Sequence, residues 1–168
     1  MKNVALIIPS LKGGGAERVI SILSQELSKD YNLYLIVFDA DDIAYSYEGN
    51  LIDLNIKANK NFFIKIFNVI RRVYYLRKVK LNYNIECSIS FLSSANIVNV
   101  LSRTNDKIVL SVRSYLSKRK KTFYNRIYKL IIKILYNKAD NVIAISKGVA
   151  KDLINNNKLD SQIIQYIY

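Results

Sequence analysis

The sequence predicts a single α/β domain: a Rossmann-like, three-layer fold in which helices flank a mainly parallel sheet of about six or seven strands. Two observations lead to this fold class. Short, continuous apolar runs such as residues 4–8 and 33–38 have the length of buried strands. Between such runs lie stretches with apolar residues every three or four positions, the spacing of a helix. A chain of 168 residues has room for one such domain, which we place over residues 1–168.

Three consecutive glycines, Gly13, Gly14 and Gly15, join the first predicted strand to a helix expected over about residues 14–29. Glycine accepts positive φ and lets a ligand oxygen approach the amides at the positive end of the following helix, which suits a phosphate or a sugar. Alternatively, the glycines only turn the chain tightly so that helix and strand can pack. A dinucleotide-binding fingerprint would need glycine at position 18, where Arg18 stands, and a P-loop is absent.

The middle of the chain predicts strands at residues 51–54, 87–91 and 107–112. Ser94 is expected to cap the helix over residues 97–103, although ligand contact by the polar turn of residues 92–96 is an equal alternative. Arg113 follows a strand, so it should reach the edge where open α/β sheets bind ligands. There it could grip a phosphate with a bidentate fork, or simply bond a carbonyl oxygen.

Two predicted helices are amphipathic and basic. The first begins near Asn61, and we expect its apolar face to pack on the sheet; its cations either form a solvated face or attract anionic headgroups. The second follows the densest group of cations in the chain. The residues expected to face an anionic membrane surface are Lys118, Arg119, Lys120, Lys121, Arg126 and Lys133.

The C-terminal part predicts a buried strand at residues 142–145, a helix capped by Ser146 and a closing strand at residues 163–168. Ser146 could instead contact a ligand, but the two uses compete for the same hydroxyl oxygen.

Composition limits the chemistry. The chain has 26 Lys and Arg against 13 Asp and Glu, a net charge of +13, which implies an anionic partner. Recognisable nucleic-acid modules are missing, so nucleic acid is not the expected partner. With no histidine and one cysteine, the sequence predicts no metal site, no disulfide and a cytoplasmic setting. No apolar run approaches the roughly 18 residues of a membrane span, so membrane contact should be peripheral.

Two segments resemble a known family. Residues 8–19 read Ile-Pro-Ser-Leu-Lys-Gly-Gly-Gly-Ala-Glu-Arg-Val, and residues 138–153 read Lys-Ala-Asp-Asn-Val-Ile-Ala-Ile-Ser-Lys-Gly-Val-Ala-Lys-Asp-Leu. Both are similar to the signatures of GT4-type glycosyltransferases with the GT-B fold, in the N-terminal, acceptor-side domain. The family often has histidine at the strand end that Arg113 occupies, so a histidine base is not expected. The resemblance implies that the glycine loop lies near the diphosphate and the transferred sugar, and that Asn96 lies at the mouth of the acceptor cleft. The candidate substrate- or phosphate-binding residues are, together, Gly13, Gly14, Gly15, Arg18, Asn96, Arg113, Ser146 and Lys147.

The resemblance implies a retaining enzyme that transfers a sugar from a nucleotide sugar, a substrate rather than a cofactor, without a metal. The acceptor would be a lipid-linked or surface-polysaccharide glycan, as in capsule or lipopolysaccharide synthesis, at the inner face of the plasma membrane. The C-terminal donor-binding domain of the family is missing here, so we expect the chain to be inactive alone, and whether it is an enzyme stays open. The alternative is a non-catalytic basic module that binds an anionic membrane surface and a partner domain.

Overall fold

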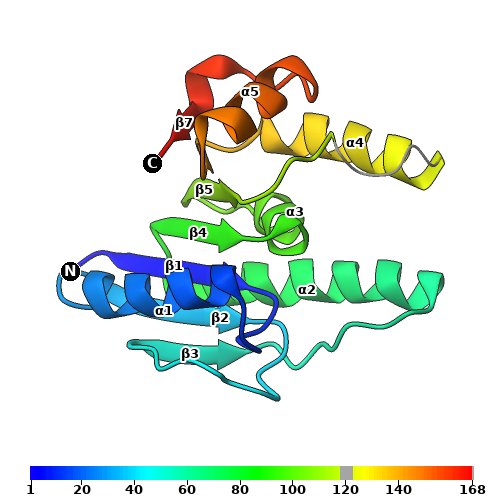
Figure 1. Ribbon diagram of the computed structural model, residues 1–168. Helices are drawn as coiled ribbons and strands as arrows, with labels where there is room; N and C mark the ends of the chain where they lie inside the picture. The colour runs from blue at the N-terminus through cyan, green and yellow to red at the C-terminus, as the bar shows by residue number, and fades with distance from the viewer. Residues whose placement is uncertain (118–122, 168) are drawn as a thin grey trace.

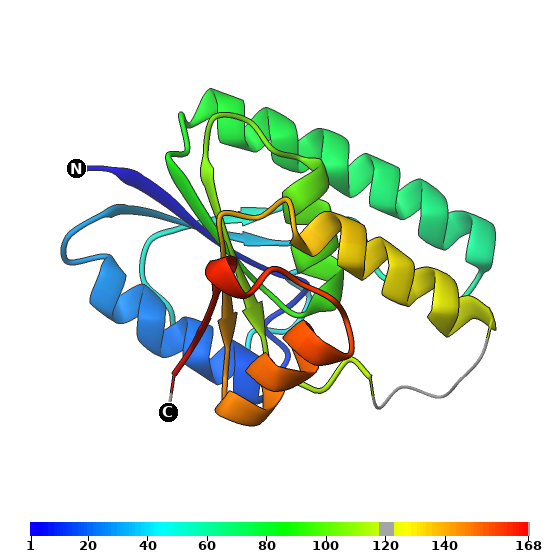
Figure 2. The same cartoon turned by 90° about the horizontal axis from the view of Figure 1, so that it is seen from above.

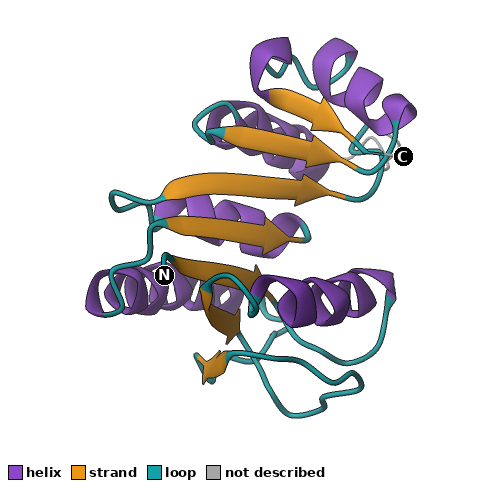
Figure 3. Ribbon diagram, turned by 90° about the vertical axis from the view of Figure 1, so that its left-hand side faces the viewer, coloured by secondary structure: helices purple, strands orange, loops and turns teal. Residues whose placement is uncertain are grey.

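The computed structural model describes residues 1–117 and 123–167, and within them the side chains of all but residues 123–125. Seven strands form one sheet in which every neighbouring pair is parallel (Figures 1 and 3). The expected α/β fold with a mainly parallel sheet is therefore confirmed. The strands are β1 (Asn3–Ile8), β2 (Asn32–Val37), β3 (Asn50–Asp53), β4 (Cys87–Phe91), β5 (Lys107–Val112), β6 (Asn141–Ala144) and β7 (Ile164–Tyr166).

Helices cover both faces of the sheet, which makes the three layers. They are α1 (Gly15–Leu27), α2 (Phe62–Asn82), α3 (Ser93–Leu101), α4 (Phe123–Tyr136) and α5 (Lys147–Asn155), with a short 3-10 turn at Ser161–Ile163. Alternation along β1 separates the layers, because Leu6 packs with α1 residues and Ile7 packs with residues of α2 and α3. Figure 2 shows α1 on one side of the sheet and α2, α3 and α4 on the other.

The strand order is β3-β2-β1-β4-β5-β6-β7, so the connection direction reverses between β1 and β4. Because all strands are parallel, the loops after β1, β4, β5 and β6 gather at one edge, the carboxyl edge. Open α/β sheets bind ligands outside this edge, at the point where the strand order reverses. The fold thus places the loop after β1, with its three glycines, beside that point.

A buried ion pair joins α2 to the opposite edge of the sheet. Lys80 Nζ lies 2.8 Å from Asp106 Oδ2, and both side chains are fully buried. Burial alone would raise the pKa of Asp106, but the Lys80 ammonium, the Ser88 hydroxyl and the Thr104 amide hold that pKa below its usual value. Asp106 is therefore ionised, and the pair anchors the last turn of α2 against β4 and β5.

Candidate functional site

The glycine turn leaves the start of α1 open. Gly13 has φ +93°, a conformation that glycine adopts without strain. Gly14 is the N-cap residue in an extended conformation, and no side chain caps the first turn of the helix. At Gly15 an added Cβ would meet no heavy atom of the described residues within 4 Å. The first amides of α1 therefore lack a side-chain partner at the positive end of the helix, as an anion or sugar site requires.

The turn is held in place by the loop that follows β2. Pro9 O accepts hydrogen bonds from the amides of Phe38 and Asp39 at 3.1 and 3.2 Å. Lys12 Nζ lies 3.8 Å from an Asp39 oxygen and 3.3 Å from an Asp42 oxygen. This bracing was not predicted from the sequence, because these residues lie far apart in the chain and no local pattern pairs them.

Two charged side chains of opposite sign flank the turn. The Glu17 carboxylate folds back, so that its Oε2 lies 2.5 Å from where a Cβ on Gly14 would stand. Arg18 is exposed. Glu17 disfavours a bare anion next to Gly14, whereas its oxygens can accept hydrogen bonds from hydroxyl groups. The turn is therefore better matched to a ligand with both phosphate and hydroxyl groups than to phosphate alone.

Arg113 lies at the same edge as the glycine turn. It follows β5, which is separated from β1 by β4 alone, so the two strand ends lie about 10 Å apart at the ordinary strand spacing. Its side chain is half-buried and forms no hydrogen bond or ion pair with other described residues. An unpaired guanidinium at this edge can receive an anionic group.

The segment after Arg113 is anchored to α5. An Asp152 oxygen accepts hydrogen bonds from the amides of Leu116 and Ser117 at 2.9 and 3.2 Å. Burial would raise the pKa of Asp152, but hydrogen bonds from Ser117, Asn156 and Leu116 hold that pKa below its usual value. An ionised Asp152 thus fixes the backbone that carries Arg113.

Asn96 lies inside the core. It is 1% exposed, its Oδ1 accepts from Ser90 Oγ at 2.9 Å, and its Nδ2 donates to Ser111 O at 3.2 Å. The structure therefore does not bring Asn96 to the candidate ligand site. The expected Ser94 cap is wrong, because α3 already begins at Ser93 and its N-cap residue is Leu92. Periodicity locates a helix but not the residue at which it begins.

Ser146 has the structural role that its position predicts. Its Oγ accepts a hydrogen bond from the Val149 amide at 3.2 Å and caps α5. Lys147, next to it, is exposed at the carboxyl edge. The Tyr115 hydroxyl occupies the space that a side chain at Gly148 would need. At the start of α5, Lys147 therefore presents an exposed side chain at the edge.

The first basic helix differs from the expectation. We predicted that its apolar face packs on the sheet, but most of that face is exposed, because the N-terminal half of α2 extends past the strand ends (Figure 1). Leu76 packs in the core, and Val69, Val73 and Val79 are partly buried against the same cluster. The outward stripe, at helical spacing, comprises Phe63 (79% exposed), Ile66, Phe67, Ile70 (61%) and Tyr74 (62%).

The second basic helix has a similar exposed surface. Arg126 and Lys133 of α4 are exposed next to Ile127, Leu130 and Ile134. Lys118, Arg119, Lys120 and Lys121 lie outside the described residues. Among the helices that the structure describes, none has the length and apolarity needed to cross a bilayer.

Comparison with known proteins decides the family. The sequence profile of Glycosyltransferase Family 4 matches residues 13–168. The chain belongs to this family. It is 26% identical over 176 aligned positions to an N-acetylgalactosaminyltransferase of Campylobacter jejuni, the N-acetylgalactosamine-N,N'-diacetylbacillosaminyl-diphospho-undecaprenol 4-alpha-N-acetylgalactosaminyltransferase. That match covers 100% of this chain and 48% of the relative, so the chain spans about half the relative's length.

Solved structures show the same fold. Sucrose-phosphate synthase from Thermosynechococcus elongatus superposes with a TM-score of 0.74 at 12% identity, over 99% of this chain and 48% of that one. UDP-N-acetylglucosamine 2-epimerase from Rickettsia bellii superposes with a TM-score of 0.69 at 11% identity, over 99% of this chain and 44% of that one. The family 4 chain shares this fold with an epimerase as well as with a synthase, so the fold alone does not name a reaction.

Proposed function

We propose that this chain is the acceptor-side half of a retaining glycosyltransferase, which transfers a sugar from a nucleotide sugar to a lipid-linked or surface-polysaccharide acceptor. The observation that carries the proposal is that the glycine turn of α1, which has no side-chain cap, and Arg113, which is unpaired among the described residues, share one edge of a family 4 domain. The acceptor class is supported by the Campylobacter jejuni relative, whose name specifies a diphospho-undecaprenol-linked glycan.

The proposed chemistry follows from charge. When the nucleoside diphosphate leaves, negative charge grows on its phosphate, and fixed positive groups at that position lower the barrier. Arg113 and the first-turn amides of α1 supply this positive potential, while Glu17 accepts hydrogen bonds from sugar hydroxyls. The chain has no histidine, so the acceptor proton passes to the donor phosphate or to water.

The donor-binding groups lie in the second domain of the family, so the chain alone should not turn over. The test incubates the chain with a nucleotide sugar and a lipid-linked acceptor, with and without a family 4 donor domain supplied as a second polypeptide. We expect product only with both. Arg113→Ala should lower that rate by about 100-fold, whereas the exposed Lys138→Ala should leave it unchanged. Turnover by the chain alone, or a full rate for Arg113→Ala, would contradict this assignment.

The exposed stripe of α2 supports peripheral attachment to the inner face of the plasma membrane. Its aromatic side chains, with the cations of α2 and α4, are typical of an interfacial helix that meets anionic lipid. The same surface favours the second candidate, a non-catalytic module that binds an anionic membrane and a partner domain. The transfer assay separates the two, because only the first candidate forms product when the donor domain is present.

A further inference from the structure

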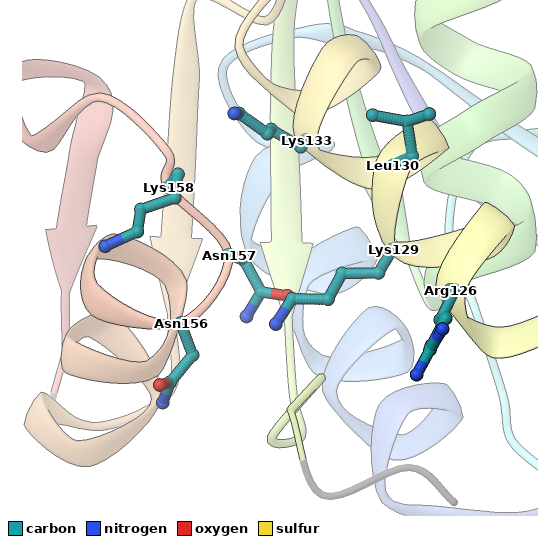
Figure 4. Close-up of a pocket in the computed structure, with 7 residues that line it drawn as sticks. All are labelled: Arg126, Lys129, Leu130, Lys133, Asn156, Asn157 and Lys158. Atoms are coloured by element: carbon teal, nitrogen blue, oxygen red, sulfur yellow. The ribbon is translucent and has the colours of Figure 1, made fainter. Parts of the chain in front are cut away.

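A hollow of about 250 Å³ lies between α4 and the loop that follows α5, and Arg126, Lys129, Lys133 and Lys158 are among the residues that line it (Figure 4). The charged ends of these side chains point in different directions, so they do not gather around one place. The carboxyl edge of the sheet, by contrast, has a strained backbone at its centre.

The strain lies in the turn from β4 into α3. β4 ends at Phe91 and α3 begins at Ser93, so Leu92 alone joins them. Leu92 has φ 71° and ψ 148°, next to a region of backbone conformation that is essentially limited to glycine. Asn55 and Asn84 also have positive φ, but asparagine tolerates it far better than leucine does. The strand-to-helix turn is therefore strained at Leu92.

The strained conformation also decides on which face of the sheet the Leu92 side chain lies. Phe91 belongs to the buried cluster on the α1 side, whereas the Ser90 hydroxyl donates to Asn96 Oδ1 of α3 on the other side, at 2.9 Å. Regular alternation would place Leu92 on the α3 side, like Ser90. Its side chain instead packs against the same α1-side cluster as Phe91. The positive φ therefore turns an apolar side chain away from the polar contacts of α3 and towards α1.

That cluster holds both ends of the glycine turn. Leu11, which comes before the turn, and Ala16, which follows it, belong to the cluster and are 1% and 6% exposed. The glycines between them have no side chain with which to anchor the turn, so its position depends in part on these two residues and on what packs with them. Leu92 contributes to this packing from the side of β4.

Leu92 also lies between the two parts of the candidate site. β4 lies between β1 and β5 and pairs with both, so the end of β4 is about 4.8 Å from the end of each neighbour. The glycine turn follows β1, and Arg113 follows β5. A side chain at the end of β4 can therefore set the distance between them.

We propose that Leu92 is a positioning residue: its side chain supports the glycine turn from the β4 side and fixes the distance of the turn from Arg113. The role rests on the proposed function, because the turn and Arg113 form the ligand site of that function. Strained residues persist only where the surrounding packing holds them, and they concentrate at functional sites. At position 92 glycine would remove the strain but also the side chain, so leucine lowers stability and keeps the turn in place.

Unfolding in urea tests the strain. Leu92→Gly and Leu92→Ala both remove the side chain, but only glycine relieves the positive φ, so Leu92→Gly should have the higher midpoint. The matched pair is Leu27→Gly and Leu27→Ala, at a partly buried leucine of the same cluster that is the last residue of α1, far from the glycine turn. There glycine should have the lower midpoint, as it ordinarily does. The same order at both positions would overturn the inference.

Amide hydrogen exchange of the chain alone tests the position of the turn. The amides of Arg18 and Ala44 donate to carbonyl oxygens in and just before the turn, at 3.0 and 2.9 Å, so both report on it. We expect both to exchange at least about fivefold faster in Leu92→Ala and Leu92→Gly. Leu92→Met, which keeps a long apolar side chain, and Leu27→Ala should leave them within about twofold of the parent. Unchanged exchange in the alanine and glycine variants of Leu92 would overturn its support of the turn.

The transfer assay with the donor domain tests the consequence for the reaction. Misplacement by about 1 Å can cost about 100-fold in rate, so Leu92→Ala and Leu92→Gly should lower kcat at least about tenfold. KM for the nucleotide sugar should stay within about threefold, and Leu92→Met should recover kcat. Alanine and glycine variants with the parent's kcat would overturn the positioning role. If the parent itself forms no product, the proposed function fails, while the exchange rates still decide whether Leu92 supports the turn.

Discussion

Replacing two residues of the exposed α2 stripe should detach the chain from anionic vesicles. In Phe63→Ser/Ile70→Ser the two side chains, 79% and 61% exposed in the structure, no longer have apolar surface to bury in the headgroup region. Full burial of such a side chain stabilises by about 2 kcal/mol, so the exposed fractions give about 3 kcal/mol for the pair. At about 1.4 kcal/mol per factor of ten, that is a loss of roughly 100-fold in partition coefficient.

Vesicle flotation with and without anionic lipid measures this partition coefficient. The matched control is Ile22→Ser/Leu101→Ser, which changes two exposed apolar residues of α1 and α3 outside the stripe. We expect the control to float like the parent, and neither variant should lose more than about 1 kcal/mol of stability, because these side chains are exposed. If the α2 variant floats like the parent, or if the control is released to the same degree, the stripe is not the membrane-binding surface.

The remaining predictions concern stability and the glycine turn. Lys80→Met should lower the free energy of unfolding in urea by about 3–5 kcal/mol, because it leaves the Asp106 carboxylate buried without its partner. The double variant Lys80→Met/Asp106→Leu should recover much of that loss. If the single and double variants lose the same stability, the two side chains are not coupled. The folded pKa values of Asp106 and Asp152 lie below the ordinary value of 3.8, so their stabilisation is present above that pH and is lost as the pH falls through the folded values. Acid unfolding of Asp152→Asn should therefore be less steep than that of the parent. Gly13→Ala should cost at least about 1 kcal/mol in thermal unfolding because its φ is positive, whereas Gly15→Ala should keep its stability and lower the transfer rate measured with the donor domain present; the reverse order of stability would contradict the turn geometry.

Local patterns were sufficient to predict the strands, the helices and their order. The apolar run at residues 4–8, the glycine turn and the periodic segment after it are all readable within one window of sequence, because strand and helix periods are local properties. The same holds for Ser146, whose role depends on an amide three residues away.

Tertiary packing decided the role of side chains for which the sequence allowed either a ligand contact or a place in the core. Asn96 follows a strand end, as a ligand contact would, yet its amide bonds to Ser90 and Ser111 inside the core. The apolar stripe of α2 has helical spacing, but spacing does not tell whether the sheet extends far enough to cover it. A pattern shows which residues share a face, and only the fold shows what lies opposite.

The amino-acid sequence by itself determined the fold class, the family resemblance and the position of the glycine turn, because each depends on residues that are neighbours in the chain. The tertiary structure alone decided that the loop after β2 holds the glycine turn, that the apolar stripe of α2 is uncovered, and that Asn96 is enclosed in the core. Each of these features depends on burial and on contacts between segments that are far apart in the chain. No local sequence pattern encodes such contacts.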